Sequence, residues 1–68
     1  MNITVNGTPR EVADDISVAE LLAELGSADA TRGIAVAVDG TVVPRAGRVS
    51  TRLAEGARVE VVTAVQGG

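Results

Sequence analysis

Cysteine, histidine, lysine and every aromatic residue are missing from this 68-residue sequence. Without cysteine and histidine, a disulfide framework and a zinc site with those ligands are excluded. The usual nucleophiles and general bases are nearly absent as well, so we do not expect an enzyme that acts alone. Serine and threonine remain, but no neighbouring residue resembles a base that could activate them. Without lysine, the chain offers no ε-amine at which copies of itself could be linked.

The charge and hydropathy of the chain exclude further classes of protein. The net charge is −3, and without clustered cations we expect no nucleic-acid partner. No apolar run is long enough to cross a bilayer, and residues 1–5 lack the features of a secretory signal, so a cytoplasmic location is expected and no membrane partner. The basic residues of the second half are interpreted as a solvated face rather than as a surface that steers a partner: Arg45, Arg48, Arg52 and Arg58.

Residues 1–12 are predicted to form a hairpin. Ile3 and Val5 alternate with polar residues, which is the period of a half-buried strand. Asn6-Gly7 follows and is typical of a type I′ turn, in which both central residues need a positive φ. The chain then returns as a second strand over residues 8–12.

A helix is predicted after this hairpin. Ser17 and Glu20 have the spacing of a capping box, and Ile16 and Leu21 that of a hydrophobic staple. Gly26 is predicted to end the helix in the left-handed conformation. The apolar side chains lie on one helical face: Val18, Leu21, Leu22 and Leu25. This face needs a sheet to cover it.

The second half is predicted to hold three strands, over residues 34–38, 41–43 and 58–62. Asp39-Gly40 joins the first two as a hairpin turn, and Pro44 ends the second because proline cannot continue a ladder. Residues 46–53 have no clean period. We expect a turn or short helix there, with Val49 and Leu53 touching the core.

These elements predict an α+β fold of the β-grasp, ubiquitin-like type. A mixed sheet of four to five strands would pack on one main helix, with the last strand parallel to the first. The predicted domain covers residues 1–64, and residues 65–68 form a flexible tail that ends in Gly67-Gly68. Glycine lacks a Cβ, so such a tail can approach another surface closely.

A family resemblance runs along the whole chain. It is carried by Asn6-Gly7, Val18-Ala19-Glu20-Leu21-Leu22, Val43-Pro44-Arg45, Glu55-Gly56, Arg58-Val59-Glu60-Val61-Val62 and Val65-Gln66-Gly67-Gly68. On these residues the sequence resembles the ThiS family, the sulfur carriers of bacterial thiamine biosynthesis. Family members often have an aromatic residue shortly after the Pro-Arg pair. This chain has Ala46-Gly47-Arg48-Val49 there, so that surface departs from the family pattern.

The resemblance implies chemistry at the C-terminal carboxylate of Gly68. An E1-like adenylyltransferase of the ThiF type would adenylate it with ATP. A persulfide sulfur, from a donor such as a cysteine desulfurase system, would displace AMP and leave a thiocarboxylate on Gly68. A thiazole synthase of the ThiG type would receive the sulfur. The carrier itself would contribute no catalytic residue, permanent cofactor or metal, while Gly67, Gln66 and Val65 would thread into the partner sites.

Val62 and Arg58 are candidates for partner docking, on the sheet face away from the helix and near the base of the tail. Exposed apolar residues beside a reactive tail indicate an interface. Three other functions stay open from the residues. The chain could carry sulfur for another pathway, as the molybdopterin synthase small subunit does. It could be a ubiquitin-like modifier that forms amide bonds with target amines, or an interaction module with an inert tail.

Overall fold

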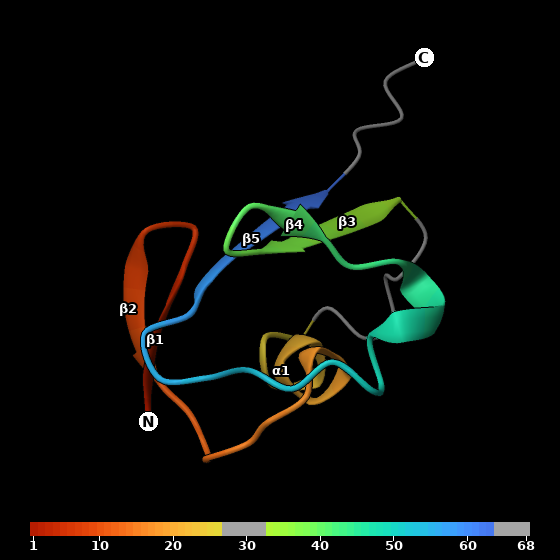
Figure 1. Cartoon of the computed structure of the whole chain (residues 1–68). Coiled ribbons are helices and arrows are strands. Elements are labelled where there is room, and N and C mark those ends of the chain that lie inside the picture. Colours follow the sequence, from red (N-terminus) through yellow and green to blue (C-terminus); the bar gives the residue numbers. More distant parts are fainter. Residues whose placement is uncertain (27–32, 64–68) are drawn as a thin grey trace.

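The computed structural model describes residues 1–26 and 33–63, which form a small sheet and two helical segments. The elements in chain order are β1 (Asn2–Val5), β2 (Thr8–Glu11), α1 (Val18–Glu24), β3 (Ile34–Val38), β4 (Thr41–Val42), the 3-10 helix η2 (Arg45–Gly47) and β5 (Arg58–Thr63). Figure 1 shows α1 against one side of the sheet. The predicted elements are therefore present, and the strands predicted over residues 8–12, 34–38, 41–43 and 58–62 differ from the observed ones by at most one residue at either end.

The five strands form one mixed sheet in the order β2-β1-β5-β3-β4. β1 pairs antiparallel with β2, and β3 pairs antiparallel with β4 and β5. β1 and β5 run parallel. The strand order places β5, the last strand, at the centre of the sheet (Figure 1). This confirms the predicted β-grasp fold and the parallel pairing of the first and last strands.

Both hairpins turn through residues with positive φ. In the first, φ is 51° at Asn6 and 82° at Gly7. In the second, φ is 50° at Asp39 and 85° at Gly40. These values match the type I′ turn, whose twist suits the right-handed twist of the flanking strands. The two turns determine the register of the outer strands against β1 and β3.

The start of α1 has the capping box predicted from the sequence. The Glu20 N–H donates to Ser17 Oγ at 3.0 Å, and the Ser17 N–H donates to Glu20 Oε1 at 2.9 Å. The Ser17 backbone N–H, the Ser17 hydroxyl and the charge of Arg52, in that order, hold the pKa of Glu20 below its ordinary value. Gly26, at φ 77°, follows the helix in the left-handed conformation. The helix thus begins and ends at the predicted positions.

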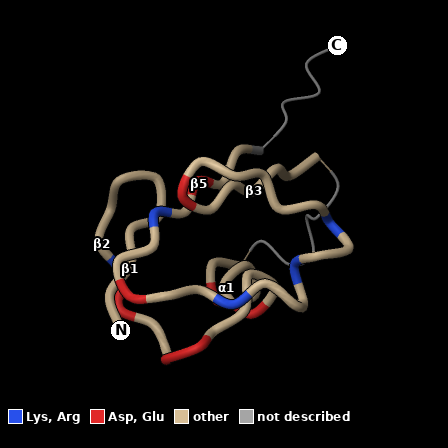
Figure 2. Tube along the Cα trace, viewed as in Figure 1, with Lys and Arg blue, Asp and Glu red and all other residues tan. Residues whose placement is uncertain are grey.

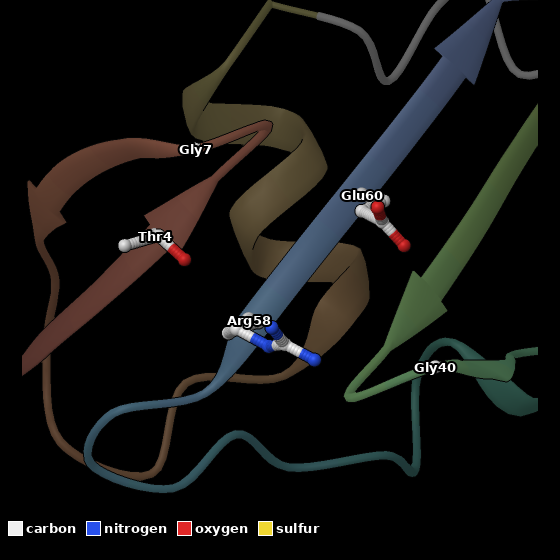
Figure 3. Close-up of a pocket in the computed structure, with 5 residues that line it drawn as sticks. All are labelled: Thr4, Gly7, Gly40, Arg58 and Glu60. Carbon is white, nitrogen blue, oxygen red and sulfur yellow. The ribbon is translucent and has the colours of Figure 1, made fainter.

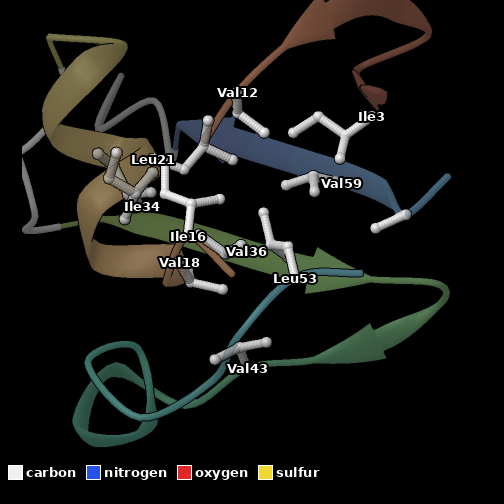
Figure 4. Packing of buried hydrophobic residues seen from close by; sticks show 12 residues of the cluster. Ile3, Val12, Ile16, Val18, Leu21, Ile34, Val36, Val43, Leu53 and Val59 are labelled. Atoms are coloured by element: carbon white, nitrogen blue, oxygen red, sulfur yellow. The ribbon is translucent and has the colours of Figure 1, made fainter. Parts of the chain in front are cut away.

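The core lies between α1 and the inner side of the sheet. Figure 4 shows the packed aliphatic side chains, and the least exposed large ones are Leu21, Val18, Val36 and Val59. Leu53 is buried as predicted, at 4% exposure. The prediction for Val49 is wrong, because its side chain is 71% exposed. Its preceding neighbour is buried instead.

That neighbour is Arg48, which corrects the interpretation of the basic residues as one solvated face. Arg48 is only 6% exposed, and its Nη2 donates to the Ile34 carbonyl at 2.6 Å. Its own carbonyl accepts from the Ala19 N–H at 3.0 Å. Within residues 1–26 and 33–63, the Arg48 Nε and Nη1 atoms find no hydrogen-bond partner. Arg48 therefore joins the segment after η2 to both α1 and β3.

Candidate functional site

The predicted reactive tail, Val65, Gln66, Gly67 and Gly68, lies outside the described residues. The structure does describe the strand that leads to it. β5 ends at Thr63. It pairs with β3 up to that residue and with β1 at its start, at Arg58 and Val59 (Figure 1). The candidate site is therefore built from the end of β5 and the sheet surface around it.

The side chains of β5 alternate between the two faces of the sheet, so that one set packs in the core and the other points outward. Val59 is 1% exposed, and Val61 is partly buried against the core. Arg58, Glu60 and Val62 point to the other side and are exposed. Successive side chains of a strand point to opposite faces, so burial of one set dictates exposure of the other. This division agrees with the prediction that Arg58 and Val62 lie on the sheet face away from the helix.

The sheet surface away from α1 is called the outer face here. It is formed by Thr4, Ala35, Ala37, Val42, Arg58, Glu60 and Val62. Val62 of β5 lies opposite Ala35 of β3, and Val42 of β4 lies opposite Ala37 of β3. Val42 is 68% and Val62 is 60% exposed. The two small alanines leave a shallow hollow of about 300 Å³ between the valines, with Asn6 and Glu60 also on its border.

A second hollow of about 220 Å³ adjoins the two hairpin turns. Figure 3 shows its lining residues, which are Thr4, Gly7, Gly40, Arg58 and Glu60. Neither Arg58 nor Glu60 forms an ion pair with any residue in the part of the chain that the structure describes. Both predicted docking candidates, Val62 and Arg58, therefore lie on the outer face, one at each hollow.

Acidic and basic residues each gather in one segment of the chain. Figure 2 shows acidic positions in the loop that enters α1 and basic positions along the segment with η2. Among the described residues, no group of three carboxylates could hold a metal ion. No helix in this part of the chain is long and apolar enough to span a membrane. On the outer face, the exposed valines Val42 and Val62 have one cation, Arg58, and one anion, Glu60, beside them.

Asn6 is a residue of this region that sequence reasoning treats only as part of a turn. Its side-chain Oδ1 accepts from the Val61 N–H at 2.9 Å, and its Nδ2 donates to the Val61 carbonyl at 3.1 Å. The two residues are 55 positions apart, and no local pattern indicates this contact. Asn6 therefore ties the first turn to the end of β5.

The described arrangement suits presentation of a chain end more than chemistry by side chains. A buried strand base, an exposed apolar patch and a strand end occur together within one small sheet. An apolar patch of this kind on a small protein is typical of a surface that another protein covers. The chemical group to be presented would follow β5 in the sequence.

Comparison with known proteins gives consistent results. The model of the ThiS family matches residues 3–68. A crystal structure of the thiamine biosynthesis protein ThiS from Geobacter metallireducens is 36% identical, with all of both chains covered and a TM-score of 0.84. A solution structure of a thiamine biosynthesis protein from the same organism is 37% identical over all of this chain and 88% of that one, with a TM-score of 0.80. No curated protein sequence matches this chain.

Proposed function

This chain belongs to the ThiS family of small sulfur carrier proteins, and we propose that it carries sulfur on Gly68 for the thiazole ring of thiamine. The observation that carries the proposal is the family match over residues 3–68, which includes the terminal Gly67-Gly68. Similarity over the full length of both chains to a thiamine biosynthesis protein supports the same pathway.

The proposed chemistry begins with a carboxylate that must be activated. A carboxylate is a poor electrophile, because its charge repels nucleophiles and oxide is a poor leaving group. In the proposal, an E1-like enzyme transfers AMP from ATP to the Gly68 carboxylate and releases pyrophosphate. A persulfide sulfur then displaces AMP, and a thiol that cleaves the resulting S–S bond leaves the thiocarboxylate. The carrier supplies no acid or base to these steps.

The carrier's own contribution is its terminal atom and its shape. The paired glycines have no side chains to obstruct a narrow active site. The central position of β5 gives the tail a firm base, since its pairing with β1 and β3 limits its motion. Holding reacting groups in the right geometry removes much of the entropic barrier to a reaction. In the proposal, a thiazole synthase then takes the sulfur from this tail.

The test is the intact mass of the protein after incubation with ATP, a ThiF-type enzyme and a persulfide source. We expect a mass increase equal to the exchange of one oxygen for one sulfur, mapped to Gly68 by fragmentation. Omission of ATP is the matched control and leaves the mass unchanged. The sulfur-carrier proposal fails if an activating enzyme that loads another ThiS protein leaves this chain unaltered. Covalent conjugates to other proteins in extract would instead indicate a modifier.

We also propose that the activating enzyme docks on the outer face, around Val62 and Arg58. Replacing Val62 by arginine is expected to lower the loading rate about tenfold or more at a low carrier concentration, because a charge in the apolar centre of an interface weakens binding. Val49→Arg is the matched control, since Val49 is a similarly exposed valine away from the sheet. Equal loading rates for the two variants would refute docking at Val62.

A further inference from the structure

The first turn of the protein holds the end of β5 through one side chain. We propose that Asn6 is a positioning residue for the tail. Its side-chain amide makes the hydrogen bonds to Val61 that further residues of β1 would make, and so holds the end of β5 in the sheet. The inference rests on the proposed function for its consequence in sulfur loading. Its structural part rests on the contacts of Asn6 alone.

The hydrogen bonds between β1 and β5 follow the regular spacing of a parallel ladder. The Thr4 N–H donates to the Ala57 carbonyl at 3.0 Å, and the Asn6 N–H donates to the Val59 carbonyl at 2.8 Å. In a parallel ladder, a residue that donates to one position of its neighbour accepts from the residue two positions later. A regular continuation would therefore join the Asn6 carbonyl to the Val61 N–H.

The backbone cannot make that bond because it turns away at Asn6. The positive φ values of Asn6 and Gly7 lead the chain into β2 instead. The Asn6 side chain supplies the missing acceptor, Oδ1, to the Val61 N–H. Its Nδ2 also donates to the Val61 carbonyl, as the N–H of a further β1 residue would. One side-chain amide thus takes the place of one peptide acceptor and one peptide donor.

The position of these bonds gives them their significance. Val61 is two residues from Thr63, at which β5 ends. A strand end that is paired on both sides loses less conformational freedom when the following residues bind a partner. In wild-type protein the β3 side of this region is paired through Ala35 with Val62, and Asn6 secures the β1 side. Loss of the Asn6 amide therefore loosens the base of the tail.

The second hairpin provides a matched control. Asp39 occupies the same turn position as Asn6, with φ 50° against 51°. Its Oδ1 accepts from the Arg58 N–H at 2.9 Å, which is a bond to the start of β5. Asp39→Gly therefore removes a comparable turn contact at the end of the strand remote from the tail. Asn6→Gly removes both bonds to Val61, and glycine adopts the positive φ readily.

The experiment measures amide hydrogen exchange and loading kinetics for the full chain. In Asn6→Gly we expect exchange at the Val61 amide to accelerate about tenfold, because the amide loses its hydrogen-bond acceptor. We expect the KM for this carrier with the ThiF-type enzyme to rise about three- to tenfold with kcat unchanged, because ordering the tail costs more. Asn6→Asp retains the acceptor and the turn preference, so its KM falls between those of wild type and Asn6→Gly.

The outcomes separate this inference from the proposed function. Unchanged exchange at Val61 in Asn6→Gly overturns the positioning role, and so does an equal acceleration of exchange at Val61 in Asp39→Gly. Faster exchange together with an unchanged KM shows that the contact does not serve loading, which also overturns it. If the wild-type chain is not loaded at all, the proposed function fails, and the exchange rates still decide whether Asn6 holds β5.

Discussion

Deletion of Gly68 is expected to abolish sulfur loading while leaving the free energy of unfolding unchanged. The deletion withdraws the terminal carboxylate by about 3.5 Å, the span of one extended residue. A displacement of that size removes the reacting carbon from the attack geometry that an activating enzyme needs. The last strand residues that pack on the core are Val59 and Val61, well before the deleted position. The measurement is intact mass after the loading reaction, with circular dichroism to follow unfolding.

Gly68→Ala is the matched control for this deletion. It keeps the length of the chain and adds only a Cβ at the last residue. We expect Gly68→Ala to be loaded more slowly than wild type and the deletion variant not to be loaded. A deletion variant that acquires sulfur at the wild-type rate would show that reach does not limit the reaction. A deletion variant that unfolds would show that the tail contributes to the core, contrary to the domain boundary predicted after residue 64.

Replacement of Leu21 by alanine is expected to cost about 2–5 kcal/mol of the free energy of unfolding. Leu21 is fully buried, at 0% exposure, and is the largest such side chain in the core of the described part of the chain. A chain of this size has a total stability of roughly 3–10 kcal/mol, taken at the usual stability per residue. The loss is therefore a large fraction of the total stability, and the variant should unfold at a clearly lower urea concentration than wild type. Urea denaturation followed by circular dichroism measures the loss.

Val49→Ala is the informative comparison for Leu21→Ala. Sequence analysis places Val49 against the core, whereas the structure leaves it 71% exposed. A truncation at an exposed site should change the free energy of unfolding by about 0.5 kcal/mol or less. A loss at Val49 as large as that at Leu21 would contradict the described packing of residues 48–53. A small loss at Leu21 would contradict the core itself.

Much of the fold could be predicted because its signals are local. The capping box joins Ser17 and Glu20, only three positions apart, and each hairpin turn is defined by two adjacent residues. The alternation of apolar side chains likewise assigns each strand an inner and an outer set. One helix with two hairpins leaves few ways to cover a sheet face, so the β-grasp fold followed. The same alternation placed Val62 and Arg58 outward.

The sequence alone thus determined the elements, their faces and the terminal Gly67-Gly68, while the tertiary structure decided the contacts between distant segments. Residues 46–53 have no period, so only packing against α1 and β3 decides that Arg48 is buried and Val49 exposed. The bonds from Asn6 to Val61 likewise form only because the parallel pairing of β1 and β5 brings them together. Local propensity acts over a few residues, whereas such contacts depend on how the whole chain closes.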